Sequence, residues 1–107
     1  MKNPTFQETK YYIQHKHLYL NESQNEAVFL GYKLDTTNME YLILKTLAIN
    51  SKKPLSLEKI CELSDQSFTK STLSYHVSNI NKKAKAIGGR PLIKNITKIG
   101  YFLNEEM

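Results

Sequence analysis

The segment from residue 69 to residue 87 constrains the fold most, because its apolar residues recur at helical spacing. Their 4,3,4,3 spacing keeps them within a narrow stripe on one face of a helix, which must therefore face a core. Gly88 and Gly89 follow as a natural C-terminal signal. We predict a helix over residues 69–87 with these residues buried: Leu73, Val77, Ile80, Ala84 and Ile87.

The opposite face of this helix is polar and cationic and carries one aromatic residue. Hydroxyl and amide groups can bond to base edges or phosphates, lysines supply charge for phosphates, and a helix with such a face fits the major groove of DNA. Glutamate is absent, although Glu–Lys pairs usually stabilise exposed helix faces. The predicted outer face holds Ser71, Tyr75, Ser78, Asn79 and Lys82, with Thr72, Ser74 and Lys85 at its margins.

The net charge of +5 is concentrated in the last forty residues. Residues 1–65 hold eight lysines and eight acidic residues, whereas residues 66–104 hold seven basic residues and no acid. A surface of one sign that excludes acids is typical of proteins that bind a polyanion, most often nucleic acid. A lysine-rich face that is merely solvated is the alternative that charge alone leaves open.

The length of 107 residues supports one small domain. An apolar content of 40% argues against disorder, and no apolar run is long enough to span a membrane or to serve as a signal peptide. A cytoplasmic location is therefore expected, without a membrane partner. The single cysteine, Cys61, cannot form an internal disulfide and is interpreted as a small core residue.

The remaining pattern predicts an α+β domain. Residues 10–35 alternate apolar and polar runs between turn-forming residues, which indicates an antiparallel meander of three or four strands. Thr37 and Glu40 form a capping box for a helix over 37–50 with Met39, Leu42, Ile43 and Leu47 at helical spacing. Residues 92–103 predict a β-hairpin whose turn lies near Asn95–Lys98.

A shorter helix is predicted over residues 57–64, between the helix over 37–50 and the helix over 69–87. Ser56 would cap it, and Ile60, Cys61 and Leu63 would supply its buried side. Strands, three helices and a hairpin in this order form the skeleton of a winged helix. We assign residues 1–9 to a flexible N-terminal tail and residues 10–107 to this domain.

Catalytic, metal and cofactor signatures are not found. The sequence has no Gly-rich phosphate loop, no paired carboxylates on a common face and no nucleophile–histidine arrangement, so an enzyme is not expected. His15 and His17 could lie on one side of a strand, but a metal site would need more ligands than the sequence places near them. We therefore predict no catalytic residue, no metal and no cofactor.

Three segments resemble the OmpR/PhoB-type winged-helix DNA-binding domain, the effector half of bacterial response regulators in two-component systems. Residues 34–44 (LDTTNMEYLIL) are similar to the family's start of the first helix, "L-T-x-x-E-x-x-L-L", with one extra residue. Residues 71–83 (STLSYHVSNINKK) are similar to its recognition helix, "R-T-V-D-x-H-I-x-x-L-R-K-K". Residues 92–103 (LIKNITKIGYFL) resemble its wing, "L-I-x-T-V-R-G-x-G-Y-x-L".

The resemblance implies a DNA-binding transcriptional regulator. Helix 69–87 would read the major groove of double-stranded DNA, and the 92–103 wing would contact phosphates or the minor groove. His76 matches the family histidine, and the resemblance implies that it lies near a phosphate. From the residues alone, His76 could equally be a boundary residue of the core. The implied DNA-binding set is Ser71, Thr72, Ser74, Tyr75, His76, Ser78, Asn79, Asn81, Lys82, Asn95, Thr97 and Lys98.

This sequence also departs from the family pattern. Ser71, Asn79, Asn81 and Thr97 replace arginines, which removes bidentate contacts to guanine and phosphate. Asparagine favours adenine, so an AT-rich site is a hypothesis, and Lys98 stands where the wing usually has glycine. The loop after the second helix, with which family members contact RNA polymerase, is short and lacks a tryptophan.

The family resemblance further implies a homodimer on direct repeats of DNA. The 107 residues include no receiver domain, so we expect either an isolated effector domain or a stand-alone regulator. The alternative function is a winged-helix protein–protein interaction module that has lost DNA binding, which the missing arginines motivate. Such a module should expose apolar groups on helix 69–87, where Tyr75 is the one large candidate.

Overall fold

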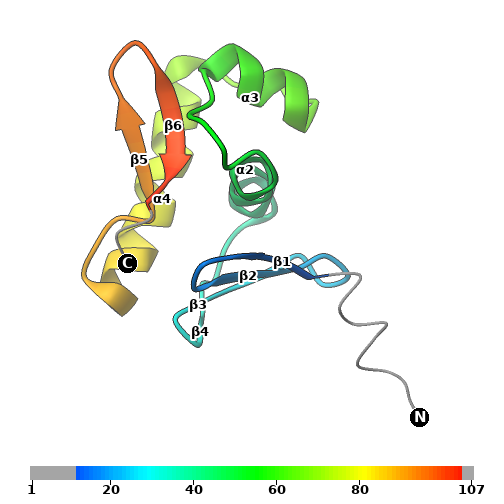
Figure 1. The fold of residues 1–107 in the computed structure, drawn as a ribbon, viewed down its shortest axis with the longest axis vertical. Coiled ribbons are helices and arrows are strands. Elements are labelled where there is room, and N and C mark those ends of the chain that lie inside the picture. The colour runs from blue at the N-terminus through cyan, green and yellow to red at the C-terminus, as the bar shows by residue number, and fades with distance from the viewer. Residues whose placement is uncertain (1–11, 105–107) are drawn as a thin grey trace.

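The computed structural model describes residues 12–104 and has an α+β architecture. A four-stranded antiparallel sheet is followed by three helices and a two-stranded hairpin, which is the predicted winged-helix order (Figure 1). The predicted tail over residues 1–9 lies outside the described residues, as do residues 105–107. Within residues 12–104 no helix is long and apolar enough to cross a membrane.

The N-terminal sheet confirms the predicted meander, with four strands in sequence order. These strands are β1 (Tyr12–His15), β2 (Leu18–Asn21), β3 (Glu26–Phe29) and β4 (Tyr32–Lys33). Leu18 pairs with Phe29 and Leu20 with Ala27, and because side chains alternate along strands, all four are buried on one face. This face closes one side of the core.

The first helix, α2 (Asn38–Ile49), begins at the predicted capping box. The Thr37 hydroxyl accepts a hydrogen bond from the backbone N–H of Glu40 at 3.1 Å, and the Glu40 carboxylate accepts one from the backbone N–H of Thr37 at 3.1 Å. Two N–H groups that a helix start leaves unpaired are thereby satisfied. Ile43, Leu44 and Leu47 then form the buried side of the helix.

The second helix, α3 (Leu57–Ser64), is capped by Ser56 as predicted, but its buried side differs from the expectation. Ile60 is fully buried and Cys61 is half-buried, whereas Leu63 is 42% exposed. The buried line runs instead from Ile60 to Ser64, four residues later on the same face, and the Ser64 hydroxyl donates to the Ile60 carbonyl at 2.6 Å. The hydroxyl is satisfied within the helix, so a serine can take the buried position.

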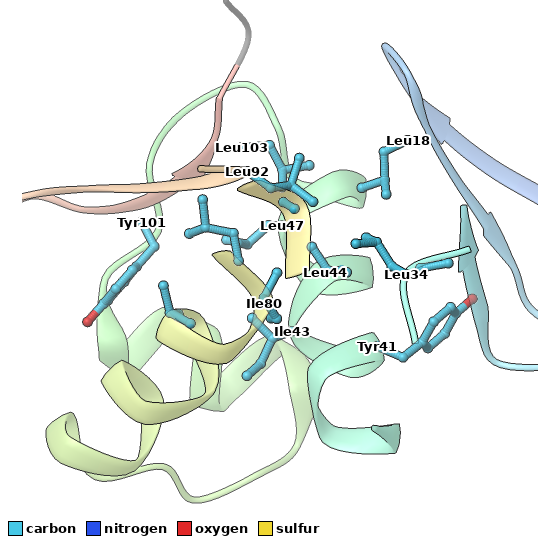
Figure 2. Close-up of a cluster of buried hydrophobic side chains, with 14 of the residues drawn as sticks. Leu18, Leu34, Tyr41, Ile43, Leu44, Leu47, Ile80, Leu92, Tyr101 and Leu103 are labelled. Carbon is cyan, nitrogen blue, oxygen red and sulfur yellow. The ribbon is translucent and has the colours of Figure 1, made fainter. Parts of the chain in front are cut away.

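The third helix, α4 (Lys70–Gly88), and the hairpin β5 (Ile93–Ile96) and β6 (Gly100–Leu103) complete the core. Figure 2 shows Ile80 from α4, Ile43 from α2 and Tyr101 from β6 in one cluster of buried side chains, with Leu18 reaching it from the N-terminal sheet. The helix therefore has one face in the core and the hairpin beside it.

The hairpin turn lies at Thr97–Ile99, so the prediction of a turn near Asn95–Lys98 was one to two residues early. Asn95 belongs to β5, where it pairs with Tyr101. The hairpin is fixed to the link before α3, because the backbones of Leu55 and Tyr101 exchange two hydrogen bonds of 2.8 Å. Gly100 permits this approach, since a Cβ atom there would lie 2.4 Å from the Leu55 carbonyl oxygen.

Candidate nucleic-acid interface

Local sequence sets both ends of α4: the glycine signal ends the helix as predicted, and Thr69 caps its start. The Thr69 hydroxyl accepts a hydrogen bond from the backbone N–H of Thr72 at 3.1 Å, and Gly89 adopts a left-handed φ of 77° and closes the last turn onto the Lys85 carbonyl. The predicted apolar stripe is buried at four of its five positions, and Ile87 is partly buried against the core. The rotation of α4 about its axis is therefore fixed.

That rotation turns the predicted polar face toward solvent. The side chains along the centre of this face are exposed. Tyr75 is the largest of them and is 64% exposed. Asn79 is half-buried at one margin. The hydroxyl, amide and ammonium groups of this face are the types that bond to base edges and phosphates. The exposed members are Ser71, Thr72, Ser74, Tyr75, Ser78, Lys82 and Lys85.

His76 lies at the border between this face and the turn that precedes α4. Its ring is half-buried and makes edge-type contacts with Phe68, at 6.0 Å between centroids, and with Tyr75, at 5.5 Å. Phe68 is held in turn by Cys61, whose sulfur accepts a hydrogen bond from the Phe68 backbone N–H at 3.3 Å. The histidine thus positions Tyr75 from the side, and Cys61 fixes the turn that supports the histidine.

Asn81 is the predicted site residue whose surroundings differ most from the expectation. Its Oδ1 accepts hydrogen bonds from the backbone N–H groups of Leu92 at 2.9 Å and Ile93 at 2.8 Å, and its Nδ2 donates to the Ile93 carbonyl at 2.9 Å. The amide is therefore occupied by the start of β5. Asn81 joins the wing to α4, and we do not include it among the groups that meet a ligand.

Thr72 and Lys83 are likewise engaged within the domain. The Thr72 hydroxyl accepts from the Thr69 backbone N–H at 2.9 Å and completes the capping box of α4. The Lys83 ammonium lies 2.7 Å from the Glu40 carboxylate, whose side chain is 3% exposed, and donates to the Asp35 carbonyl at 2.7 Å. Lys83 therefore compensates a buried charge on α2 and joins α2 to α4.

The wing places the other predicted residues beside the N-terminal end of α4. Asn95, Thr97 and Lys98 are all exposed, and Lys98 has a left-handed φ of 68° in the turn. A hollow of about 510 Å³ separates the wing from the helices and is lined by these three residues together with Lys70 and Ser56, among others. Lys98 and Lys70 bring two positive charges to its lining, and Glu58 brings one negative charge.

Sequence reasoning missed Lys70 as part of this surface, because the residue precedes the polar stripe of the helix. Its position at the first residue of α4, next to the predicted wing, was the available signal. The structural roles of Asn81 and Lys83 had no comparable local signal, since their partners lie 11 or more residues away. Among residues 12–104, no group of three or more His, Cys, Asp or Glu side chains could hold a metal ion.

The comparisons with known proteins agree with this geometry. A family profile described as "Transcriptional regulatory protein, C terminal" matches residues 31–103. A search of curated proteins found no match.

Solved structures with the same fold include response-regulator DNA-binding domains. The DNA-binding domain of CpxR from E. coli aligns with a TM-score of 0.70 and 26% identity, over 86% of this chain and 94% of that one. The DNA-binding domain of the response regulator AdeR, solved with an intercistronic region, aligns with a TM-score of 0.74 and 21% identity, over 85% and 97%. The RstA DNA-binding domain of Klebsiella pneumoniae, solved with its RstA box, aligns with a TM-score of 0.70 and 14% identity, over 86% and 95%.

The family match covers well over half of the chain and includes both the outer face of α4 and the wing. The structure supplies the winged-helix order that the matched solved structures share. This chain belongs to the OmpR/PhoB-type family of C-terminal effector domains, the DNA-binding domains of bacterial response regulators.

Proposed function

We propose that this domain binds double-stranded DNA with α4 in the major groove and the β5–β6 wing on adjacent phosphates or the minor groove. The observation that carries the proposal is the outer face of α4, which is polar, exposed and free of acidic residues. The buried apolar stripe on the opposite side of α4 fixes the rotation of the helix, so α4 presents the same outer face to every ligand. The family membership supports the same assignment.

The groups that we assign to DNA contact fall into two classes. Lys82, Lys98 and Lys70 supply charge for phosphates and carry no sequence information. Tyr75, Ser78 and Asn79 are placed to meet base edges, with Ser71 and Ser74 beside them. His76 supports Tyr75 and lies close enough to the surface to meet a phosphate. Thr72 and Asn81 hold the helix and the wing in place.

Base preference should come from Asn79 and Tyr75, because the face carries no arginine for guanine. An asparagine amide can bond bidentately to adenine, and an aromatic ring can contact the methyl group of thymine. We therefore propose an AT-rich recognition site. Binding as tandem copies on direct repeats is the arrangement that the family resemblance supports, and the stoichiometry of binding to one and two half-sites tests it.

The test is a fluorescence-anisotropy titration with labelled duplexes of AT-rich and GC-rich sequence at several salt concentrations. Binding should weaken steeply with salt, because phosphate contacts release counterions. Asn79→Ala should reduce the preference for the AT-rich duplex by about 1–3 kcal/mol if its contact is bidentate. A domain that binds neither duplex at low salt would instead be a protein–protein interaction module, and the proposal would be wrong.

A further inference from the structure

A second hollow lies on the other side of the wing, and we call it the back-of-wing hollow. It has a volume of about 400 Å³ and is bounded by the loop between α2 and α3 and by the outer face of the hairpin. Among residues 12–104, the part of the chain that the structure describes, its lining contains no acidic residue. The lining residues are Ser51, Lys52, Lys53, Pro54, Lys94, Ile96, Phe102 and Asn104.

The register of the hairpin explains why this hollow faces away from α4. Lys94 pairs with Phe102, and the next residues along each strand point to the opposite side. That opposite side includes Ile93 and Leu103, which are buried in the core. The Asn81 amide ties Ile93 to α4, so the hairpin cannot turn its other face toward the helix. The hollow and the outer face of α4 are therefore separate surfaces, although Ile96 at the end of β5 lines both this hollow and the first one.

The floor of the hollow is apolar and accessible. Ile96 is 40% exposed, and Phe102 and Pro54 are half-buried around it. Burial of apolar surface of this kind favours binding because it removes that surface from water. Phosphates gain nothing from such a floor, which argues for a ligand with an apolar side chain.

The rim of the hollow is cationic. Lys52 and Lys53 are exposed on the α2–α3 loop, and the ion pairs recorded within residues 12–104 involve Lys33, Lys45, Lys59 and Lys83 instead. Two adjacent exposed lysines beside an apolar floor are complementary to carboxylates that flank an apolar group. Charge complementarity of this kind speeds association and selects the partner.

We propose that the back-of-wing hollow is a docking site for an acidic peptide segment of a partner protein. One aromatic or aliphatic side chain of the segment would lie on Ile96, Pro54 and Phe102, and flanking carboxylates would meet Lys52 and Lys53. Such a partner would bind to the face of the wing opposite α4. The proposal does not depend on DNA binding by α4, and the two are measured separately.

The probe is a fluorescein-labelled peptide with one phenylalanine between three glutamates on each side, titrated with the full chain by anisotropy. Two matched peptides replace the phenylalanine by glutamine or all the glutamates by glutamine. Binding of the first peptide should be at least about tenfold tighter than binding of either control, which corresponds to about 1.4 kcal/mol. If the peptide without phenylalanine binds equally well, charge alone accounts for the binding and the proposal is overturned.

The double variant Lys52→Glu/Lys53→Glu tests the rim, with Lys16→Glu in the turn between β1 and β2 as a single-site control for charge reversal away from the hollow. Both lysines of the loop are exposed, so the fold should be retained, which circular dichroism checks. Peptide affinity should fall at least about tenfold in the double variant and stay unchanged in the control. If the domain binds DNA, the double variant should retain more DNA affinity than Lys82→Glu.

Two outcomes would assign the hollow to another occupant and overturn the proposal. If the double variant loses DNA affinity as strongly as Lys82→Glu, the hollow belongs to the DNA interface. If the peptide binds only after Glu105→Gln/Glu106→Gln, the last residues of this chain compete for the lysines, and the occupant is this segment.

Discussion

The assignment of Asn81 to the frame of the domain makes a quantitative prediction for Asn81→Ala. The substitution removes three hydrogen bonds between α4 and the start of β5 and leaves two backbone N–H groups and one carbonyl without their partner. The residues that carry these groups, Leu92 and Ile93, are each 2% exposed. At about 1 kcal/mol for each orphaned buried group, the free energy of unfolding should fall by about 3 kcal/mol.

Urea denaturation followed by circular dichroism measures this loss. Asn79→Ala is the matched control, since it removes the same amide two residues away without breaking a hydrogen bond to any other part of residues 12–104, and it should change stability by less than about 0.5 kcal/mol. Asn81→Asp keeps an acceptor for both N–H groups and loses only the donor, so its cost should lie between the two. A loss below about 0.5 kcal/mol for Asn81→Ala would refute the structural role.

Three further predictions concern other contacts within the domain. Lys83→Met should cost about 3 kcal/mol in urea denaturation, because it leaves the buried Glu40 carboxylate without its cation; a neutral effect would contradict the pairing. Gly100→Ala should destabilise the domain and raise amide hydrogen exchange in the wing, because its Cβ would meet the Leu55 carbonyl; unchanged exchange would argue against this close approach. Glu22→Gln should flatten the acid limb of the stability–pH profile below about pH 4.5, and an unaltered limb would exclude this carboxyl as its source.

The sign of the last prediction follows from the surroundings of Glu22. Burial by itself raises the pKa of Glu22, but hydrogen bonds from Lys45 and Tyr41 outweigh it and hold the pKa below its ordinary value. The ionised carboxylate therefore stabilises the fold above the pKa of the unfolded chain, and this contribution is lost as the pH falls through the folded pKa. Burial and the bond to Glu22 also raise the pKa of Tyr41, so its hydroxyl stays protonated.

Local signals in the sequence predicted the elements well. The capping box at Thr37, the cap at Ser56 and the glycine after α4 each act within a few residues, so they could be recognised without the fold. The apolar stripe of α4 was equally reliable, because periodicity over a long helix leaves one face for the core. The outer face of α4 could be predicted because it lies on the side of the helix opposite the buried stripe.

Predictions that depended on distant partners were less accurate. Asn81 was assigned to DNA contact through the family resemblance, whereas its hydrogen bonds to Leu92 and Ile93 arise from the return of the wing, which the local sequence does not show. Leu63 was predicted to be buried, but within residues 12–104 its side of α3 is left 42% exposed. The turn of the wing was placed early because Asn95 favours turns, whereas pairing with Tyr101 keeps it in β5.

The salt dependence of DNA binding tests the central claim most directly. The affinity of the domain for an AT-rich duplex should fall linearly on a logarithmic plot against salt, and Lys82→Gln should reduce the slope by about 0.9 for its one phosphate contact. Lys85→Gln, at the margin of the outer face of the same helix, is the variant with which the slope of Lys82→Gln is compared. If the domain binds without salt dependence, or if Lys82→Gln leaves both slope and affinity unchanged, α4 does not present this face to DNA.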